Sequence, residues 1–279
     1  MHFGPLLLIM SSSSGGASSD GASQKQGGAS QKQGGASPSS GGASASSVSA
    51  SKVAIAQQKI RTLQVPARDN GSKSSKLNGS QVPEVFAFWF TLLAQMVLNP
   101  SNVTILDAFG NVGGDAILMA LLGMKVLSIE LNETRFECLT RNVASLGLGD
   151  RITSRHCNFL RWLKDVKHGT RFNLVYLDPP WFPGNGPHKA TKTYTDLFIV
   201  VNGSELVSVF SIITRIFELG LTDTIVLKIP PKSAFKQLPV KTKSTRVKVT
   251  GGGKFPQFLL LVINKDDYFE HLKSLQCEM

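Results

Sequence analysis

The chain has 279 residues and a formal net charge of +11, because 30 Lys and Arg outnumber 19 Asp and Glu. This excess favours a polyanionic partner, nucleic acid above all. No apolar stretch approaches the roughly 20 residues of a transmembrane helix, residues 5–10 lack the basic flank of a secretion signal, and the spacing of Cys138, Cys157 and Cys277 excludes a structural zinc site. We therefore expect an intracellular protein in a reducing compartment, without a metal and without a membrane partner.

Residues 1–80 form a low-complexity and basic N-terminal segment. Within it, residues 11–50 are almost entirely Ser, Gly and Ala, and they carry a tandem copy of Gly-Ala-Ser-Gln-Lys-Gln-Gly. Such a composition cannot bury enough apolar surface to offset the entropy lost on ordering. The sequence therefore predicts a disordered tail over residues 1–80 and one folded domain over residues 81–279.

Strand and helix patterns alternate along that domain. In chain order we expect a helix at 83–98, a strand at 103–108, a helix at 114–122, a strand at 125–130, a helix at 133–146, strands at 151–156 and 172–178, a helix at 204–219 and a strand at 224–229. Two further strands, 245–250 and 258–264, flank three consecutive glycines, which is typical of an antiparallel pair. The predicted fold class is α/β and Rossmann-like, with a doubly wound, mostly parallel sheet that ends in this antiparallel pair.

A glycine-bearing turn follows the first predicted strand, with the sequence Asp107-Ala108-Phe109-Gly110-Asn111-Val112-Gly113-Gly114-Asp115. Gly110 and Gly113 would let a ligand approach the backbone, and the next helix would present its unpaired N–H groups. The spacing departs from G-x-G-x-x-G, which disfavours a nicotinamide cofactor. Asp107 would repel a pyrophosphate but hold a cationic amino group, such as the one that S-adenosylmethionine carries.

Two more strand ends contribute to the predicted cofactor site. Glu130, followed by Leu131, ends the second strand, where an acid can accept both hydroxyls of a ribose. Asn158 and Phe159 follow the third strand, at the level of an adenine ring, where the amide would bond the adenine edge and the ring would pack on it. An N-cap role for Asn158 is an equally good interpretation, and the two roles are compatible. Phe109 and Asp178 complete the predicted cofactor contacts.

The tetrad Asp178-Pro179-Pro180-Trp181 ends a buried apolar strand. Its prolines fix the backbone and donate no N–H, so their carbonyls stay free to accept hydrogen bonds. A planar base with an NH₂ group would stack on Trp181, while Asp178 and the Pro179 carbonyl accept its two amine protons. The tetrad therefore predicts methyl transfer to an amine, with these four residues as the catalytic set.

These motifs resemble those of the trimethylguanosine synthases, RNA cap guanine-N2 methyltransferases of the class I fold. The family pattern Asp-Pro-Phe-Cys-Gly-Val-Gly-Gly-Asn is similar to residues 107–115, and its Ser-Pro-Pro-Trp is similar to residues 178–181. A Thr-Pro-Glu and a Gly-Asp-Phe-Leu of the family are matched in part by Val82-Pro83-Glu84 and by residues 157–160. The resemblance covers residues 81–265 and implies S-adenosylmethionine as the cofactor.

The resemblance also implies the substrate. Trp181 would stack on the 7-methylguanine of a capped RNA, whether small nuclear, small nucleolar or messenger, and Asp178 would position its N2 amine. Pro183, Asn185 and Lys189, in the segment after the tetrad, would contact the substrate. Basic segments such as 228–254, which contains eight Lys or Arg and no acid, would meet the triphosphate of the cap. We expect a monomer in the nucleus or the cytoplasm.

Several departures from the family pattern leave alternatives open. Asp178 replaces a Ser, Asn158 replaces an Asp and Asn111 replaces a Gly. Asp-Pro-Pro-Trp also resembles the tetrad of adenine-N6 methyltransferases, so an adenine-N6 enzyme or a guanine-N2 enzyme for uncapped RNA is the second hypothesis. A methyltransferase-like module that binds RNA without turnover is the third. Other aromatic residues, Phe86, Trp89 and Trp162, are predicted to pack in the core.

Overall fold

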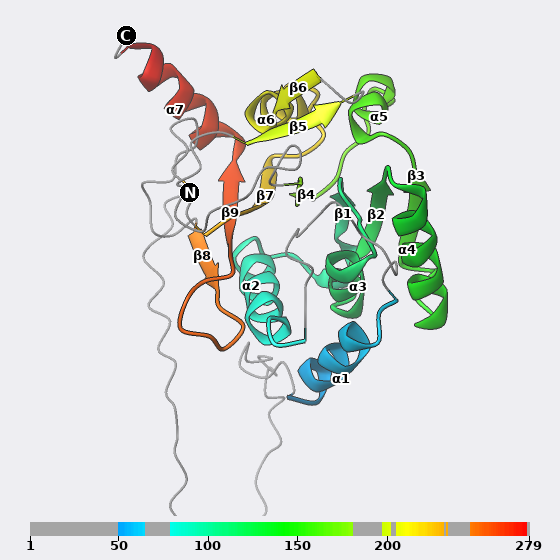
Figure 1. Ribbon diagram of the computed structural model, residues 1–279. Coiled ribbons are helices and arrows are strands. Elements are labelled where there is room, and N and C mark those ends of the chain that lie inside the picture. Colours follow the sequence, from blue (N-terminus) through cyan, green and yellow to red (C-terminus); the bar gives the residue numbers. More distant parts are fainter. Residues whose placement is uncertain are drawn as a thin grey trace, which may run out of the picture. The chain divides into compact units, whose positions relative to one another are not determined.

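The computed structural model describes residues 50–64, 79–180, 197–201, 205–231, 233 and 246–277. Its strands are β1 Thr104–Asp107, β2 Lys125–Glu130, β3 Ile152–His156, β4 Leu174–Leu177, β5 Phe198–Val201, β6 Glu205–Ser208, β7 Thr224–Ile229, β8 Arg246–Val249 and β9 Phe258–Asn264. Within the described residues, seven of them form one sheet in the order β3-β2-β1-β4-β7-β9-β8, and β5 pairs with β6 (Figure 1). The predicted α/β class is confirmed.

Strand direction follows the prediction as well. The strands β3, β2, β1, β4 and β7 are parallel neighbours, whereas β9 runs antiparallel to both β7 and β8. All residues of β4 and β7 are buried, as expected for central strands that are covered on both faces. The carboxyl ends of β1, β2 and β4 therefore lie together at one edge of the sheet, which is where ligands bind in folds of this class.

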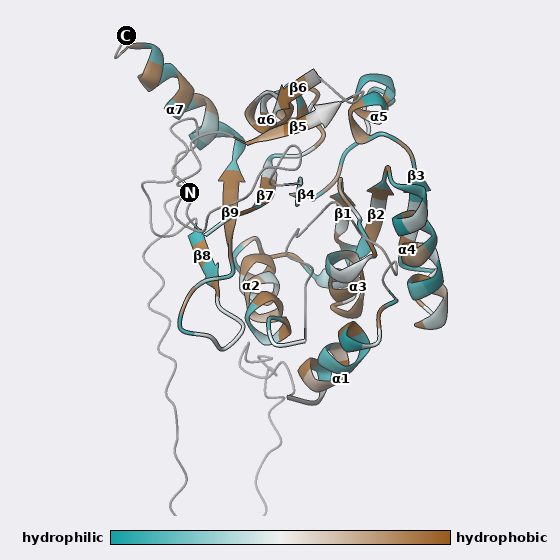
Figure 2. Ribbon diagram, viewed as in Figure 1, coloured by the Kyte–Doolittle hydropathy of each residue, from teal (hydrophilic) through white to brown (hydrophobic). Residues whose placement is uncertain are grey.

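The helices are α1 Ala50–Arg61, α2 Val82–Gln95, α3 Gly114–Leu121, α4 Glu133–Ser145, α5 Phe159–Asp165, α6 Val209–Glu218 and α7 Lys265–Cys277, with a 3-10 turn at Pro100–Asn102. In Figure 1, α1, α2 and α3 lie together and away from α5 and α6. In Figure 2 strands β2 and β9 are largely brown, whereas α4 has both teal and brown residues. Trp89 and Phe86 of α2 are buried, which confirms their predicted place in the core.

Helix α1 lies in the stretch that the composition predicts to be disordered. Its Ala56 and Ile60 side chains are buried, and the helix packs against α2 and α3. This part of residues 1–80 therefore differs from the predicted tail. The rest of that prediction, over residues 1–49 and 65–78, lies outside the described residues.

The predicted helix over 204–219 is partly wrong. Residues Glu205–Ser208 form strand β6, and α6 begins only at Val209, because the Ser208 side chain accepts a hydrogen bond from the Phe210 N–H and caps the helix. Strand β5 and helix α7 were not predicted. No helix among the described residues is both long enough and apolar enough to cross a membrane.

Candidate active site

A cavity of about 460 Å³ opens at the carboxyl ends of β1, β2 and β4. Its walls include six of the residues that the sequence predicts for a cofactor: Phe109, Glu130, Leu131, Asn158, Phe159 and Asp178. Pro180 of the tetrad lines it too. The volume falls within the range of about 300–1,000 Å³ that is typical of small-molecule sites. Motifs that are far apart in the sequence are thus brought to one place.

Glu130 is held at the floor of the cavity by backbone groups. One carboxylate oxygen accepts the Asn111 N–H at 2.7 Å and the other accepts the Asn132 N–H at 2.7 Å. Only 8% of the residue is exposed, and this burial raises its pKa although both hydrogen bonds act to lower it. Each oxygen keeps a further lone pair, so the side chain is oriented to accept two neighbouring hydroxyl groups of a ligand.

Apolar side chains form the other wall. The Phe109 and Phe159 rings meet edge to face with centroids 5.6 Å apart, and Leu131 is 60% exposed beside them. An exposed Leu at the mouth of a cavity is suited to cover an aromatic ligand. Asn158 has the predicted N-cap role, because its side-chain oxygen accepts the N–H groups of Leu160 and Arg161 at 2.8 and 3.2 Å.

The glycines of the turn after β1 serve packing within the chain. A Cβ on Gly110 would stand 2.2 Å from the Ser128 hydroxyl oxygen, and a Cβ on Gly113 would stand 2.6 Å from a Leu139 methyl group. Gly113 also has a φ of +94°, in the left-handed region. Neither glycine lines the cavity. Because these glycines are small, the turn packs closely against β2 and α4. This packing positions the neighbouring residues that do line the cavity.

Asp107 is likewise not on the cavity wall. It is 1% exposed, and its carboxylate accepts the Ser128 hydroxyl at 2.8 Å and the Phe109 N–H at 3.4 Å. Its pKa is raised to about 8, mainly by burial and in part by the nearby Asp115 and Asp178, although the Ser128 hydrogen bond acts to lower it. The carboxyl group is therefore largely protonated at neutral pH.

Lys228 is the centre of a buried ionic cluster with Asp115 and Asp178. The register of β4 against β7 pairs Leu177 with Leu227, which brings the next two residues, Asp178 and Lys228, side by side. The Lys228 Nζ lies 2.8 Å from Asp178 Oδ2 and 3.2 Å from Asp115 Oδ2, and its side chain has no exposed surface. It also lies 4.6 Å from the centroid of the Phe258 ring.

The charges of this cluster do not balance. Two carboxyl groups, Asp115 and Asp178, share one ammonium group in a buried setting, and the largely protonated Asp107 lies near them. Burial raises the pKa of Asp178 to about 6, although Lys228 opposes this shift. The Asp178 Oδ1 atom is buried and has no hydrogen-bond partner within the described residues. The site thus has negative charge and an open acceptor, which suits a cationic or amine-bearing ligand.

Sequence reasoning assigned Lys228 to the basic segment 228–254, which is wrong for this residue because it is fully buried. The available signal was a single lysine inside the otherwise apolar run Thr224–Ile229. Asp115 and the β5 residue Ile199, which also lines the cavity, were missed too. Asp115 and Asp178 occupy the two positions where the family pattern quoted above has a neutral Asn and a neutral Ser.

The remaining predicted residues divide into two groups. Pro179 is buried and Pro180 is exposed, and both belong to the described chain. Trp181, Pro183, Asn185 and Lys189 lie outside the described residues.

Comparisons with known proteins identify a family whose match covers these motifs, and several solved structures with a similar fold. The sequence profile of a family described as RNA cap guanine-N2 methyltransferase matches residues 102–270, more than half of the chain. Among solved structures, the putative methyltransferase yhhF from Escherichia coli has 18% identity and a TM-score of 0.44, over 72% of this chain and 90% of that chain. A putative O-methyltransferase from Klebsiella pneumoniae has 14% identity and a TM-score of 0.43, over 76% and 89%. The hMettl16 catalytic domain in complex with a 3′UTR hairpin has 12% identity and a TM-score of 0.47, over 77% and 79%.

Proposed function

We propose, on the premise that this chain belongs to the RNA cap guanine-N2 methyltransferase family, that its acceptor is the exocyclic N2 amine of a 7-methylguanosine cap on RNA. The general activity is that of a methyltransferase that uses S-adenosylmethionine. The observation that carries the specific acceptor is the Asp178 carboxylate, fixed through one oxygen by Lys228 and unpartnered at the other within the described residues.

The cavity fits the cofactor by the chemistry of its lining. Glu130 offers two oriented acceptors for a ribose, and Leu131, Phe109 and Phe159 offer apolar contacts for an adenine. The carboxyl groups of Asp115 and Asp178 outnumber the one ammonium group of Lys228. This excess suits the positive charges of the sulfonium and the amino group of the cofactor. When bound, S-adenosylmethionine supplies a methyl group on an electrophilic sulfonium, which an amine can attack without a strong base.

Asp178 has two tasks in this proposal. Its pKa of about 6 keeps it ionised at neutral pH, so that Oδ1 accepts one amine proton of the guanine. The Pro179 carbonyl accepts the other, and Trp181 holds the plane of the base. These contacts align the nitrogen lone pair with the methyl group. On methyl transfer, Asp178 or a water molecule would take up the amine proton.

The test is transfer of labelled methyl from S-adenosylmethionine to a 7-methylguanosine-capped RNA and to the same RNA without a cap, with nucleoside analysis of the product. Label in N2-methylated guanosine from the capped RNA alone is the expected result. Label in N6-methyladenosine, or in guanosine of both RNAs, would overturn the cap assignment. Cofactor binding without label in either RNA would indicate a binding module.

Variants connect that result to the site. Asp178→Asn keeps the shape of the side chain but removes its charge, and Trp181→Ala removes the stacking surface. We expect each to lower kcat/KM at least about a hundredfold, the scale of losing an aligned charged hydrogen bond and a stacked ring. The matched control is Asp150→Asn, a carboxylate on an exposed turn. Full activity in Asp178→Asn would exclude this residue from the reaction.

A further inference from the structure

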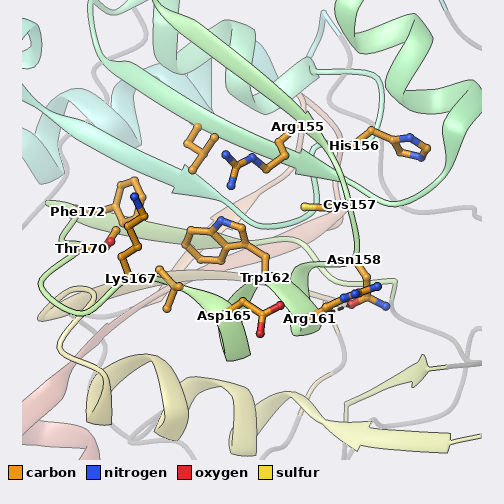
Figure 3. Close-up of a pocket in the computed structure, with 12 residues that line it drawn as sticks. Arg155, His156, Cys157, Asn158, Arg161, Trp162, Asp165, Lys167, Thr170 and Phe172 are labelled. Atoms are coloured by element: carbon orange, nitrogen blue, oxygen red, sulfur yellow. Dashed lines mark hydrogen bonds between the residues drawn. The ribbon is translucent and has the colours of Figure 1, made fainter.

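A second cavity, of about 640 Å³, lies between α5 and the face of strands β2 and β3. Strand residues Leu127 and Arg155 line one side of it, and Trp162 of α5 lines the other. Lys167 and Phe172, from the segment between α5 and β4, lie at one end. Figure 3 shows Arg155 and Trp162 turned toward one another into the hollow. We refer to this cavity as the α5 groove.

The α5 groove carries an excess of positive charge. Arg155, Arg161 and Lys167 line it and are exposed, and none of them forms an ion pair within the described part of the chain. Asp165 is the one acid among the described lining residues. Cations that converge on one hollow attract a polyanion and give it charge-assisted hydrogen bonds.

An aromatic platform accompanies these cations. The half-buried Trp162 ring stacks on Phe159 with centroids 6.0 Å apart, and it meets Phe172 at 6.4 Å. These contacts fix the indole while part of it stays open to the groove. His156 also lines the cavity but projects away from its centre (Figure 3), because its ring stacks on Phe136 at 5.1 Å. Trp162 is therefore a fixed aromatic ring that a ligand in the groove can contact.

The α5 groove adjoins the candidate active site. Asn158 lines both cavities, and Arg161 lies next to it in Figure 3, at the end of the groove opposite Lys167. A chain that leaves the active site past Asn158 would meet Arg161 first, then the Trp162 ring, and finally Lys167. Alternating cations and a fixed aromatic ring are the chemistry that single-stranded nucleic acid requires, with phosphates on the cations and a base on the ring.

We propose that the α5 groove binds a single-stranded segment of the substrate RNA, with one base stacked on Trp162 and the neighbouring phosphates held by Arg155 and Lys167. This inference rests on the proposed function, because it assigns a path to the same RNA. In this proposal the active site holds the acceptor nucleotide, and the α5 groove holds a further segment of the same RNA. The groove would therefore favour long capped RNAs over the cap alone.

The experiment compares the full-length double variant Arg155→Gln/Lys167→Gln with Lys125→Gln/Lys164→Gln. The control removes the same charge from exposed positions on β2 and α5 that do not line the groove. Fluorescence anisotropy measures binding of an unstructured 12-nucleotide RNA, capped and uncapped, over a series of salt concentrations. Methyl transfer is measured on the capped RNA and on a cap dinucleotide. Thermal unfolding checks that both variants fold.

We expect the groove variant to bind both RNAs about tenfold more weakly than the control. Its slope of log Kd against log salt should fall by about 1.4, because each phosphate that the protein no longer neutralises lowers the slope by about 0.7. Its kcat/KM on the cap dinucleotide should equal that of the control. Trp162→Leu, which retains an apolar contact with Phe159, should also weaken RNA binding about tenfold. Equal RNA affinity and equal salt slope in the groove variant and the control would overturn the proposal.

The two proposals fail in different ways. If no methyl reaches any cap, the cap assignment fails, whereas a loss of affinity for uncapped RNA in the groove variant still supports the groove. If caps are methylated and the groove variant binds RNA as the control does, the groove assignment alone is wrong.

Discussion

The turn after β1 and the end of β4 are neighbouring parts of one site, but different forces build them. The turn depends on shape, because Gly110 and Gly113 leave no room for a Cβ against Ser128 and Leu139. The end of β4 depends on charge, because Asp178 is held by a lysine with no exposed surface. A steric change should therefore damage the first region, and a change of charge should damage the second.

The two regions meet at the ends of the turn motif. Asp107, its first residue, lies near Asp178, and Asp115, its last residue, shares Lys228 with Asp178. Where the family pattern has Asn and Ser, this chain has Asp115 and Asp178 and supplies a buried lysine between them. The three residues form one electrostatic unit, and a change to one of them alters the others.

The largest effect is expected from Lys228→Met. Removal of the ammonium group leaves two buried carboxyl groups without their partner, and breaking a buried pair in this way costs about 3–5 kcal/mol. Urea unfolding should show this loss, whereas Lys248→Met, on the exposed side of β8, should change the free energy of unfolding by less than about 0.5 kcal/mol.

A triple variant sharpens that test. Lys228→Met combined with Asp115→Asn and Asp178→Ser removes all three charges and restores the neutral residues of the family pattern. It should regain most of the lost stability, because neutral or apolar replacements of a whole buried ionic group are tolerated. If the triple variant is no more stable than Lys228→Met, the ionic cluster is not the reason for the loss.

The second effect concerns Asp107 and pH. Burial raises its pKa from 3.8 to about 8, so between these values the folded state keeps a proton that the unfolded state has released. The free energy of unfolding therefore falls as pH rises through this window, by up to about 1.4 kcal/mol per pH unit. Asp107→Asn should remove most of this slope between about pH 5 and 7 in urea titrations. An unchanged slope would contradict the buried, protonated carboxyl.

The third effect tests the shape of the turn. Gly110→Ala places a methyl group against Ser128 and should lower the free energy of unfolding by about 1–2 kcal/mol, as overpacking does. It should also weaken binding of the cofactor, because the displaced turn carries the Asn111 N–H that orients Glu130. Gly149→Ala is the control, since a Cβ there meets nothing within 4 Å. Equal stability of the two variants would exclude a steric role for Gly110.

The smallest expected effect is on the affinity for S-adenosylmethionine, and it depends on both regions. A cationic ligand binds ionised carboxylates more tightly, and the pKa values of Asp107 and Asp178, about 8 and about 6, lie across neutral pH. Affinity for S-adenosylmethionine should therefore rise about tenfold from pH 6 to pH 8, measured by calorimetry. S-adenosylhomocysteine, which lacks the sulfonium charge, should show a smaller rise. The same rise for both ligands would argue against charge recognition by this cluster.

Much of the fold followed from local patterns. The apolar run Lys125–Glu130 and the run Thr224–Ile229 were predicted with their observed bounds, because buried parallel strands have a continuous apolar signal. The helix predicted at 204–219 failed at its start. There, four residues pair with β5 to form β6, and a short pattern of Glu, Leu, Val and Ser does not distinguish such a strand from a first helical turn.

The candidate site was predicted in part for a similar reason. Glu130, Asn158 and Asp178 each follow a recognisable strand, and in a parallel sheet such positions meet at one edge. Lys228 is a single lysine in an apolar strand, which was a signal of burial, but it also begins a basic stretch of the sequence and was interpreted as part of that stretch. Its partners are 50 and 113 positions away in the sequence.

The sequence by itself determined most of the strands and helices from 82 to 264, the motif that predicts the cofactor and the tetrad that predicts an amine acceptor, because each is a short-range pattern of residue type. Only the tertiary structure decided which side chains form buried ion pairs. The β4–β7 register brings Asp178 beside Lys228, and the turn after β1 brings Asp115 to the same ammonium group. Because these groups are buried, their pairing strongly affects stability: an unpaired buried charge is costly, whereas a paired carboxylate is held in the orientation that accepts a hydrogen bond.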